Sequence, residues 1–522
     1  MTPSVSQQAV SAYESGRMED AETFALAALK IQPGEPEASR VIGMVRLGQG
    51  NPDAAIEYLK AGCDVAPANG KLAHLLGAAY RQKGNPKAAF KYFQKAIEAD
   101  PSDPAAWQDL GTTALSLARW SDANCAFMQC LKIEQDNVEA SAGMAFLALR
   151  DKDAALALRT AHMITARHPD HLFSRHVIAE AHLLLGEHQQ ALEEAIAIAK
   201  HPDATESMKG IVLGIAADAS DALGKYDQAF EQHLQAKAHI ANEEWRYLQY
   251  LDKRGHFERL ADIADIVPTL ANKTKTWPEF EKGPQHVIFI GFPKSGVSVL
   301  NNVLLRHPQI VDVSGRPLSQ RWMDILWSEH AAQNLASLEY EDLVALRAES
   351  EESLEKAGFL LPEGSVAYQF LPFYSQYMAG LMMVQPTAKI IFMHRDPRDV
   401  VLSCFKQRFA ARISMYEFLK LETTTRFYDL VMGVVHAVRE NFDVDLIELS
   451  FDDVFDDIEG EARRVIKFLG MEWQDGLVLD EDRVVNRELQ DGRRVRGWHN
   501  YEAHLAPVRP VLDKWAERFG YG

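Results

Sequence analysis

The stretch His286-Val-Ile-Phe-Ile-Gly-Phe-Pro-Lys-Ser-Gly-Val-Ser298 decides the fold of the second half of this 522-residue chain. Its first five residues form a short apolar, β-branched run of the kind that builds a buried parallel strand. A glycine-bounded loop follows, and Val299, Leu300 and Val303 then give the apolar spacing of a helix. Backbone N–H groups and the helix dipole converge where a loop opens a helix, so the segment predicts a phosphate-binding site.

This loop differs from the Walker A loop of nucleoside triphosphatases at one decisive position. Gly291, Gly296 and Ser298 keep the Walker spacing, but Val297 stands where that loop requires a lysine. The lysine lies inside the loop instead, at Lys294. A kinase of the P-loop class is therefore the least favoured functional hypothesis.

A second motif of the same kind lies further along the chain. Lys389-Ile-Ile-Phe-Met-His394 predicts another buried strand, and Arg395-Asp-Pro-Arg-Asp-Val-Val-Leu-Ser403 follows it. Asp396 before Pro397 predicts a helix start, with the aspartate as the cap and the proline as the first helical residue. We expect that helix to bring Ser403 back toward Arg395. Loops after the carboxyl ends of parallel strands meet at one edge of an open sheet, so both motifs predict one ligand crevice.

Together these motifs resemble the sulfotransferases that use 3′-phosphoadenosine-5′-phosphosulfate (PAPS). Pro-Lys-Ser-Gly at 293–296 resembles the family's 5′-phosphosulfate loop, and the pair Arg395 and Ser403 resembles its 3′-phosphate site. The Arg-Asp-Pro-Arg-Asp wording is common in the bacterial and tyrosylprotein branches. Val444–Asp453 is similar to the family's late strand and acidic box, and Arg493-Arg-Val-Arg-Gly-Trp498 resembles its last cofactor-contacting segment.

The resemblance implies an α/β domain with a P-loop-like central parallel sheet over residues 284–522. It implies PAPS as the sulfate donor, no metal, and Lys294 as the catalytic residue. The donor-binding residues that it implies are Pro293, Lys294, Ser295, Gly296, Val297, Ser298, Arg395, Ser403, Arg493 and Arg494.

The chain departs from the family pattern where catalysis and acceptor handling are concerned. The Gly-Glu pair that usually follows His-Pro after the first helix is Gly315-Arg316 here, and the usual Asp-Lys is absent from Ala367–Pro372. Val297 replaces the usual threonine of the loop. A hydroxyl acceptor needs a general base, and the candidates are Asp312 and His394, each of which also has a structural interpretation.

The first half of the chain repeats itself with a period of 34 residues. Four independent positions keep this register with small residues or proline: Gly16, Gly50 and Gly84; Ala21, Ala55, Ala89 and Ala123; Gly43, Gly77 and Gly111; Pro33, Pro67 and Pro101. Small residues permit two helices to cross closely, glycine permits the turn between them, and proline ends the second helix. The pattern resembles the tetratricopeptide repeat, and it predicts about seven helical hairpins that end near residue 240.

Such an array buries a continuous apolar face and leaves a concave surface, which is the usual place for a protein or peptide partner. The three- and four-residue spacing of Leu72, Leu76 and Tyr80 predicts core positions on the buried face. Residues 241–283 change character and predict a helical linker. We therefore expect a solenoid at 1–240, a linker at 241–283 and an α/β domain at 284–522.

Composition limits the partners of the chain. Its net charge of -19 argues against nucleic acid or an anionic membrane as the main partner. Cys63, Cys125, Cys130 and Cys404 form no regular framework and predict reduced thiols. We find neither a signal-like N-terminus nor a long apolar run, so we expect a cytoplasmic protein.

Two hypotheses from different classes remain. In the first, the protein is an enzyme that transfers sulfate to a hydroxyl acceptor, with a protein or peptide brought by the repeats as one candidate acceptor. In the second, a sulfotransferase-like module serves as a scaffold whose repeats recruit partners. Lys294, Arg395 and Ser403 favour the enzyme, and the replaced Gly-Glu and Asp-Lys pairs favour the scaffold.

Overall fold

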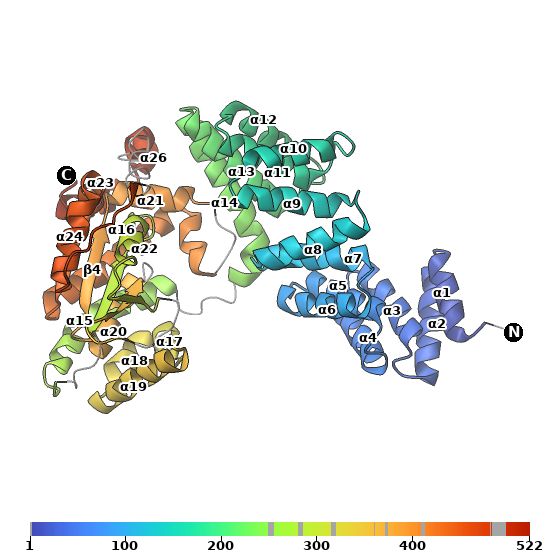
Figure 1. Ribbon diagram of the computed structural model, residues 1–522, viewed down its shortest axis with the longest axis horizontal. Coiled ribbons are helices and arrows are strands. Elements are labelled where there is room, and N and C mark those ends of the chain that lie inside the picture. Colours follow the sequence, from blue (N-terminus) through green and yellow to red (C-terminus); the bar gives the residue numbers. More distant parts are fainter. Residues whose placement is uncertain are drawn as a thin grey trace. The chain divides into compact units, whose positions relative to one another are not determined.

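The computed structural model describes residues 3–248, 255–279, 285–314, 320–359, 361–370, 374–408, 413–480, 482 and 497–522. These residues form two compact units (Figure 1). One unit comprises Met1–Ala204 with Asp218–Leu223, and the other comprises Thr205–Ala217 with Gly224–Gly522. The architecture is helical at the N-terminal side and α/β at the C-terminal side, which confirms the predicted fold class.

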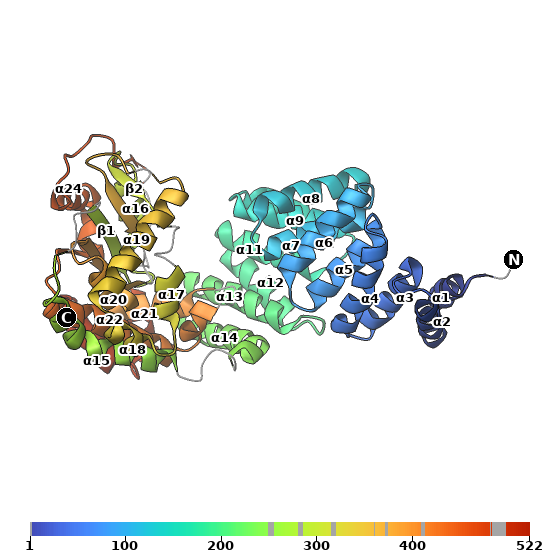
Figure 2. The same ribbon diagram turned by 90° about the horizontal axis from the view of Figure 1, so that it is seen from below.

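Helices follow one another without a strand from Val5 to Leu248 in the described part of the chain. They are α1 Val5–Glu14, α2 Met18–Ile31, α3 Pro36–Gly48, α4 Pro52–Val65, α5 Gly70–Gln82, α6 Pro86–Ala99, α7 Pro104–Ser116, α8 Trp120–Ile133, α9 Val138–Arg150, α10 Ala154–Thr165, α11 Leu172–Leu184, α12 His188–Ala199, α13 Glu206–Ala222 and α14 Tyr226–Leu248. Consecutive hairpins from α1 to α12 lie side by side (Figure 2). The predicted helical repeats are therefore present.

Each predicted repeat position has the structural role that its residue type indicates. Gly50 and Gly84 sit at the turns inside their hairpins with φ of +69° and +79°. Gly77 lies where two helices cross, because a Cβ atom added there would come within 2.7 Å of the Phe93 ring. Ala89 of the alanine series is completely buried. The 34-residue register is thus a register of close helix packing.

The second unit is built on one five-stranded parallel sheet of order β2-β3-β1-β4-β5. Its strands are β1 Gln285–Gly291, β2 Ile310–Asp312, β3 Val366–Phe370, β4 Lys389–His394 and β5 Leu446–Ser450. The predicted strands at 286–290 and 389–394 are both present, and they are neighbours, with Val287 paired to Lys389. Because all strands are parallel, the loops that follow β1 and β4 leave the same edge of the sheet.

Helices cover both faces of this sheet. They are α15 His256–Thr274, α16 Val297–Leu304, α17 Gln320–Trp327, α18 Ala331–Ser337, α19 Tyr340–Lys356, α20 Met378–Val384, α21 Pro397–Lys406, α22 Leu421–Asn441, α23 Phe451–Asp456, α24 Ile458–Phe468, α26 Glu502–Leu505 and α27 Arg509–Arg518. Three 3₁₀ helices accompany them: η1 Tyr374–Tyr377, η2 Ile413–Leu419 and η3 Gly497–Tyr501. Ile288 and Ile290 of β1 face a core shared with α15, α20 and α22, whereas Val287 and Phe289 face a core shared with α16 and α24.

Two helices that precede the sheet, α14 and α15, belong to the second unit. Phe230 of α14 lies with its ring centroid 5.3 Å from that of Phe405. Leu260, Ile263 and Val267 of α15 are buried in the core beside the sheet. The compact units divide near residue 204, and the boundaries at 240 and 283 stay predictions.

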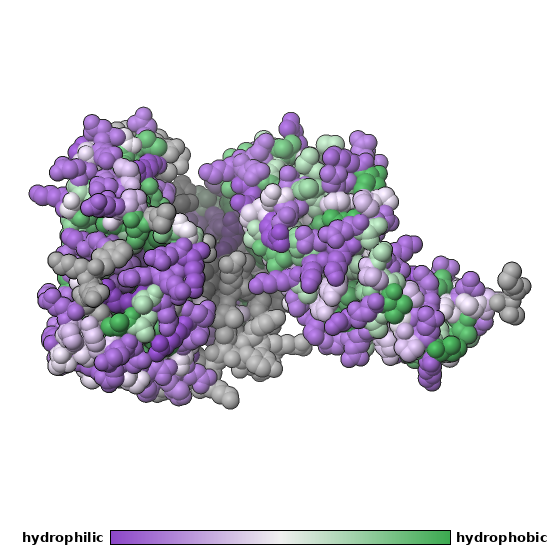
Figure 3. Space-filling model, turned by 60° about the horizontal axis from the view of Figure 1, so that its bottom comes forward, coloured by the Kyte–Doolittle hydropathy of each residue, from purple (hydrophilic) through white to green (hydrophobic). Residues whose placement is uncertain are grey.

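Hydrophilic residues make up most of the surface visible in Figure 3, with small hydrophobic groups scattered among them. Exposed large apolar side chains include Ile31, Met163 and the adjacent pair Leu184 and Leu185. Among the described residues, no helix combines the length and the apolar character needed to cross a bilayer.

Candidate functional site

The loop between β1 and α16 has the backbone of an anion cradle. Lys294 and Gly296 adopt left-handed conformations, with φ of +70° and +87°. Between them the buried Ser295 closes the turn, because its hydroxyl donates to the carbonyl oxygen of Phe292 at 2.6 Å. Alternating left-handed residues turn successive N–H groups toward one side, which is how a backbone nest binds anions.

The glycines of this loop leave room only for the backbone. A Cβ atom at Gly296 would lie 2.1 Å from a ring carbon of Phe451, and one at Gly291 would lie 2.8 Å from the carbonyl oxygen of Met393. Gly296 is also the N-cap of α16, and no side chain caps that helix. The first N–H groups of a helix have no intrahelical partner, so the uncapped end suits a phosphate group.

The second motif begins as the sequence predicts. Asp396 is the N-cap of α21 and Pro397 is its first residue, and the Asp396 carboxylate accepts from the backbone N–H of Arg398 at 3.0 Å. The Arg395 side chain crosses to the first loop, where Nη1 donates to the carbonyl oxygen of Lys294 at 3.3 Å. The two predicted phosphate motifs are therefore in direct contact.

Arg395 is held by two further contacts. Its Nη2 lies 3.5 Å from Oδ2 of Asp399, which is only 5% exposed, and its Cζ lies 4.9 Å from the centroid of the Phe451 ring. Asp399 and Ser403 are four residues apart on α21, so they lie on one face of the helix. Ser403 is half-buried one turn beyond the ion pair. Arg395 and Ser403 thus belong to the same side of the site.

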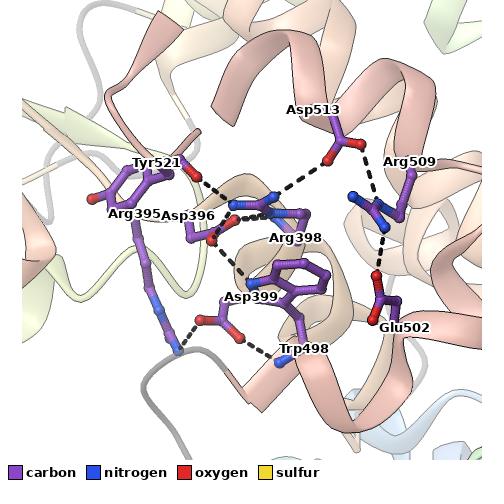
Figure 4. Close-up of polar contacts among 9 residues, drawn as sticks. All are labelled: Arg395, Asp396, Arg398, Asp399, Trp498, Glu502, Arg509, Asp513 and Tyr521. Atoms are coloured by element: carbon purple, nitrogen blue, oxygen red, sulfur yellow. Dashed lines mark hydrogen bonds and ion pairs between the residues drawn. The ribbon is translucent and has the colours of Figure 1, made fainter. Parts of the chain in front are cut away.

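The C-terminal part of the chain packs onto this motif, as Figure 4 shows. The backbone N–H of Trp498 donates to Asp399 at 3.0 Å, and its indole N–H donates to Asp396 at 3.1 Å. Arg398 donates to Asp396 at 2.8 Å and to the carbonyl oxygen of Tyr521 at 2.6 Å. The two aspartates of the motif therefore anchor a segment a hundred residues away, and sequence reasoning missed these contacts.

Two more contacts fix the phosphate loop from other elements. The Cys404 thiol of α21 donates to the carbonyl oxygen of Pro293 at 3.3 Å. The buried Ser375 hydroxyl of η1 donates to the carbonyl oxygen of Gly291 at 2.6 Å. The first three residues of the loop are thus held by side chains from the elements that follow β3 and β4.

The segment that holds both predicted phosphate motifs matches a known family. Residues 284–475 match the sulfotransferase family. The matched segment contains the Pro-Lys-Ser-Gly loop, both central strands and the motif from Arg395 to Ser403. Residues 40–104 match the tetratricopeptide repeat. One segment of the chain is therefore similar to the tetratricopeptide repeat and another to the sulfotransferase family.

Other similar proteins cover only part of the chain. An uncharacterized protein from Aquifex aeolicus is 22% identical over 354 residues, which is 62% of this chain and 44% of the relative. The chain thus matches less than half the length of that relative. A tetratricopeptide repeat protein from Parabacteroides merdae has a TM-score of 0.37 and 16% identity, over 46% of this chain and 93% of that one. YrrB, a repeat protein titled as having an unusual peptide-binding site, has a TM-score of 0.30 and 20% identity, over 32% and 87%.

The departures from the sulfotransferase pattern have different physical consequences. Val297, in place of threonine, is 5% exposed and packs in the core with α16 and α24. Phe370 ends β3 within the stretch that lacks the Asp-Lys pair, and its ring packs edge-on against Phe289 at 5.7 Å. Both side chains are therefore apolar packing residues. Gly315, Arg316, Arg493, Arg494 and Arg496 lie outside the described residues.

The two candidate bases occupy contrasting places at the carboxyl edge of the sheet. Asp312 is exposed at the end of β2 and accepts from the backbone N–H of Ser314 at 2.9 Å. His394 is buried, its ring stacks on Phe519 at 4.6 Å, and burial lowers its pKa to about 4. A group with that pKa is a weak proton acceptor near neutral pH, so the structural interpretation accounts better for His394. Among the described residues, no group of three or more metal-ligating side chains occurs.

Proposed function

We propose that this protein transfers a sulfuryl group from PAPS to a hydroxyl acceptor. The observation that carries the proposal is the contact between Arg395 and the backbone of Lys294, because it joins the two phosphate motifs of a sulfotransferase-family segment. A nucleotide with phosphates at both its 5′ and 3′ positions suits two anion sites at one sheet edge. The donor would supply the sulfuryl group, and the chain would supply alignment and charge.

The roles follow from the geometry of the loop. The N–H of Ser295 donates to the carbonyl oxygen of Phe292, so the N–H groups of Gly296, Val297 and Ser298 would hold the 5′-phosphate at the start of α16. Lys294 would stabilise the negative charge that develops on the leaving phosphate. Arg395 and Ser403 would bind the 3′-phosphate, with Arg493 and Arg494 as further donor-binding residues. Transfer of this kind depends on alignment and electrostatic stabilisation more than on covalent catalysis.

The acceptor and its delivery belong to the same proposal. The repeats offer a surface of the type that binds protein or peptide segments, so a hydroxyl on a protein or peptide is the acceptor class that we propose. A cytoplasmic location is also part of the proposal. Asp312, at the carboxyl end of β2, is the remaining candidate base.

Binding of 3′-phosphoadenosine-5′-phosphate (PAP) tests the donor site without knowledge of the acceptor. We expect Arg395→Ala to weaken PAP binding by about tenfold to a hundredfold in calorimetry, because a charged hydrogen-bonding group is lost. Adenosine-5′-phosphate, which lacks the 3′-phosphate, should bind wild type and variant alike. Arg463→Ala removes an exposed arginine that pairs with Glu459 on α24, and it should bind PAP as wild type does.

Two variants of Lys294 separate charge from backbone conformation. Lys294→Gly removes the ammonium group but accepts the left-handed backbone, so PAP binding should fall modestly while sulfuryl transfer is lost. Lys294→Arg retains a cation and should retain part of the transfer. A folded wild-type protein that binds no PAP would contradict the donor assignment and leave the alternative of a sulfotransferase-like scaffold with partner-binding repeats.

A further inference from the structure

Helix α14 places a buried lysine against the end of α21. Lys237 is 4% exposed, and its Nζ donates to the carbonyl oxygen of Gln407 at 2.6 Å. Gln407 is the residue at which α21 ends, and a cation at a helix C-terminus interacts favourably with the helix dipole. Lys237 therefore holds the last turn of the helix that carries Ser403 and starts at the Arg395 motif.

Aromatic packing fixes this lysine in place. Phe230 and His233, two turns and one turn before Lys237 on α14, lie with ring centroids 5.3 Å and 6.3 Å from that of Phe405. Phe230 also stacks on His504 at 4.2 Å. Lys237 thus occupies a defined position in the second unit, set by a helix that the sequence assigns to the last repeat.

Cations from three different elements act on one buried thiol beside the phosphate loop. Burial raises the pKa of Cys404 to about 12, and the charges of Lys294, Lys237 and Arg395 each lower it. The same thiol contacts the carbonyl oxygen of Pro293. The electrostatic effect of a charge on a thiol weakens with distance. Lys237 therefore acts on the same thiol as Lys294 and Arg395, the two predicted phosphate-binding residues.

Like charges gathered in a partly buried region repel one another, and a bound phosphate group offsets this repulsion. Lys237, Lys294 and Arg395 bring three positive charges to the surroundings of Cys404, and Asp399 pairs with one of them, Arg395. We propose that Lys237 is a positioning residue of the donor site, acting through its charge and through the last turn of α21 on the binding of a nucleotide that carries two phosphate groups. This inference rests on the proposed function, and it makes the final repeat helix a part of the donor site.

The test is calorimetric titration of PAP into the full-length protein and four variants. Lys237→Gln retains a donor for the Gln407 carbonyl but removes the charge, and we expect its dissociation constant to rise about tenfold. Lys237→Arg retains the charge and should bind PAP nearly as wild type does. Lys237→Met removes both charge and donor and should show the largest loss. Lys209→Gln removes a lysine of α13 that pairs with Glu206, and it should leave binding unchanged.

The experiment must distinguish a role of Lys237 in PAP binding from a role in folding stability alone. Thermal unfolding of each variant without nucleotide is measured beside the titrations, and Lys237→Gln decides if Lys237→Met does not fold. A folded Lys237→Gln variant that binds PAP within twofold of wild type would overturn the inference and leave the donor assignment intact. A folded wild type that binds no PAP would overturn the donor assignment, and the inference with it.

Discussion

Glycines with left-handed backbones occur in both regions of the molecule, and their surroundings differ. Gly50, in a hairpin turn of the repeats, has φ of +69° and open space around the position of an added Cβ. Gly296, in the predicted phosphate loop, has φ of +87° and the Phe451 ring in that space. At Gly50 only the backbone favours glycine. At Gly296 the left-handed backbone and the packing both require glycine, because the loop backbone lies directly against the Phe451 ring.

Two ion-paired carboxylates, the buried Asp396 of the second unit and the half-buried Asp109 of the repeats, provide the largest expected difference. Asp396 is 3% exposed and accepts hydrogen bonds from Arg398 and from the Trp498 indole, so Asp396→Ala leaves a buried guanidinium without its main anion. We expect the free energy of unfolding of the second unit to fall by about 3–5 kcal/mol, measured by urea denaturation.

Asp109 of the repeats is the matched control. It accepts from His74 at 2.9 Å and from Arg81 at 2.6 Å, but the Arg81 side chain is 41% exposed. Asp109→Ala should therefore cost about 1 kcal/mol, because water replaces much of what is lost. Equal losses in the two variants would show that the C-terminal anchoring at Asp396 adds nothing to stability.

Alanine at Gly296 and at Gly50 separates backbone strain from close packing. Gly50→Ala should cost about 1 kcal/mol, because the left-handed conformation alone is penalised. Gly296→Ala should cost about 3 kcal/mol, since its methyl group also displaces the buried Phe451 ring, and it should weaken PAP binding as the loop shifts. Urea denaturation of each variant, with PAP titration of Gly296→Ala, measures both effects. Similar losses from the two substitutions would contradict the role of Phe451.

The sequence predicted the repeats because each hairpin repeats a local pattern. It also predicted β1, β4 and the cap at Asp396, since strand runs and the Asp-Pro pair are local signals. The anchoring of Trp498 by the two aspartates could not be predicted, because it joins residues a hundred positions apart. For α15, the apolar spacing of Leu260, Ile263 and Val267 was a usable signal, but the prolines and charges around it favoured a linker.

Two buried histidines of the second unit and one carboxylate of the repeats should respond to acid in different pH ranges. Burial lowers the pKa of His286 and of His394 to about 4, well below the ordinary value of 6.5. In the repeats, a hydrogen bond from His171 lowers the pKa of Glu139, so the Glu139 carboxylate responds only as pH falls below its ordinary range. Between pH 6.5 and 5, His286 and His394 should therefore respond to acid, and the Glu139 carboxylate should not.

The sign follows from proton binding. Between about pH 6.5 and 4 the unfolded chain binds protons at His286 and His394 and the folded chain does not, so lowering the pH favours unfolding. Each group should remove about 2 kcal/mol of stability between pH 6.5 and 5. His286→Leu removes one titrating group, and its urea midpoint should depend less on pH than that of wild type. An unchanged pH dependence would mean that the His286 ring is hydrated in the folded protein.

The smallest expected effect lies in the repeats, at turns that lack glycine. Ala118 and Lys152 occupy the register of Gly84 one and two repeats later, and they keep its left-handed backbone, with φ of +57° and +64°. The fold requires a left-handed backbone at these two turns, and a residue with a Cβ atom adopts that backbone only at a cost in free energy. Ala118→Gly should therefore raise stability by about 0.5–1 kcal/mol, and Lys152→Gly should do the same. Ala114→Gly is the control, because Ala114 lies inside α7 and glycine there should destabilise by about 1 kcal/mol. Thermal unfolding distinguishes these opposite signs, and a loss of stability at all three positions would mean that chain entropy outweighs backbone strain at the turns.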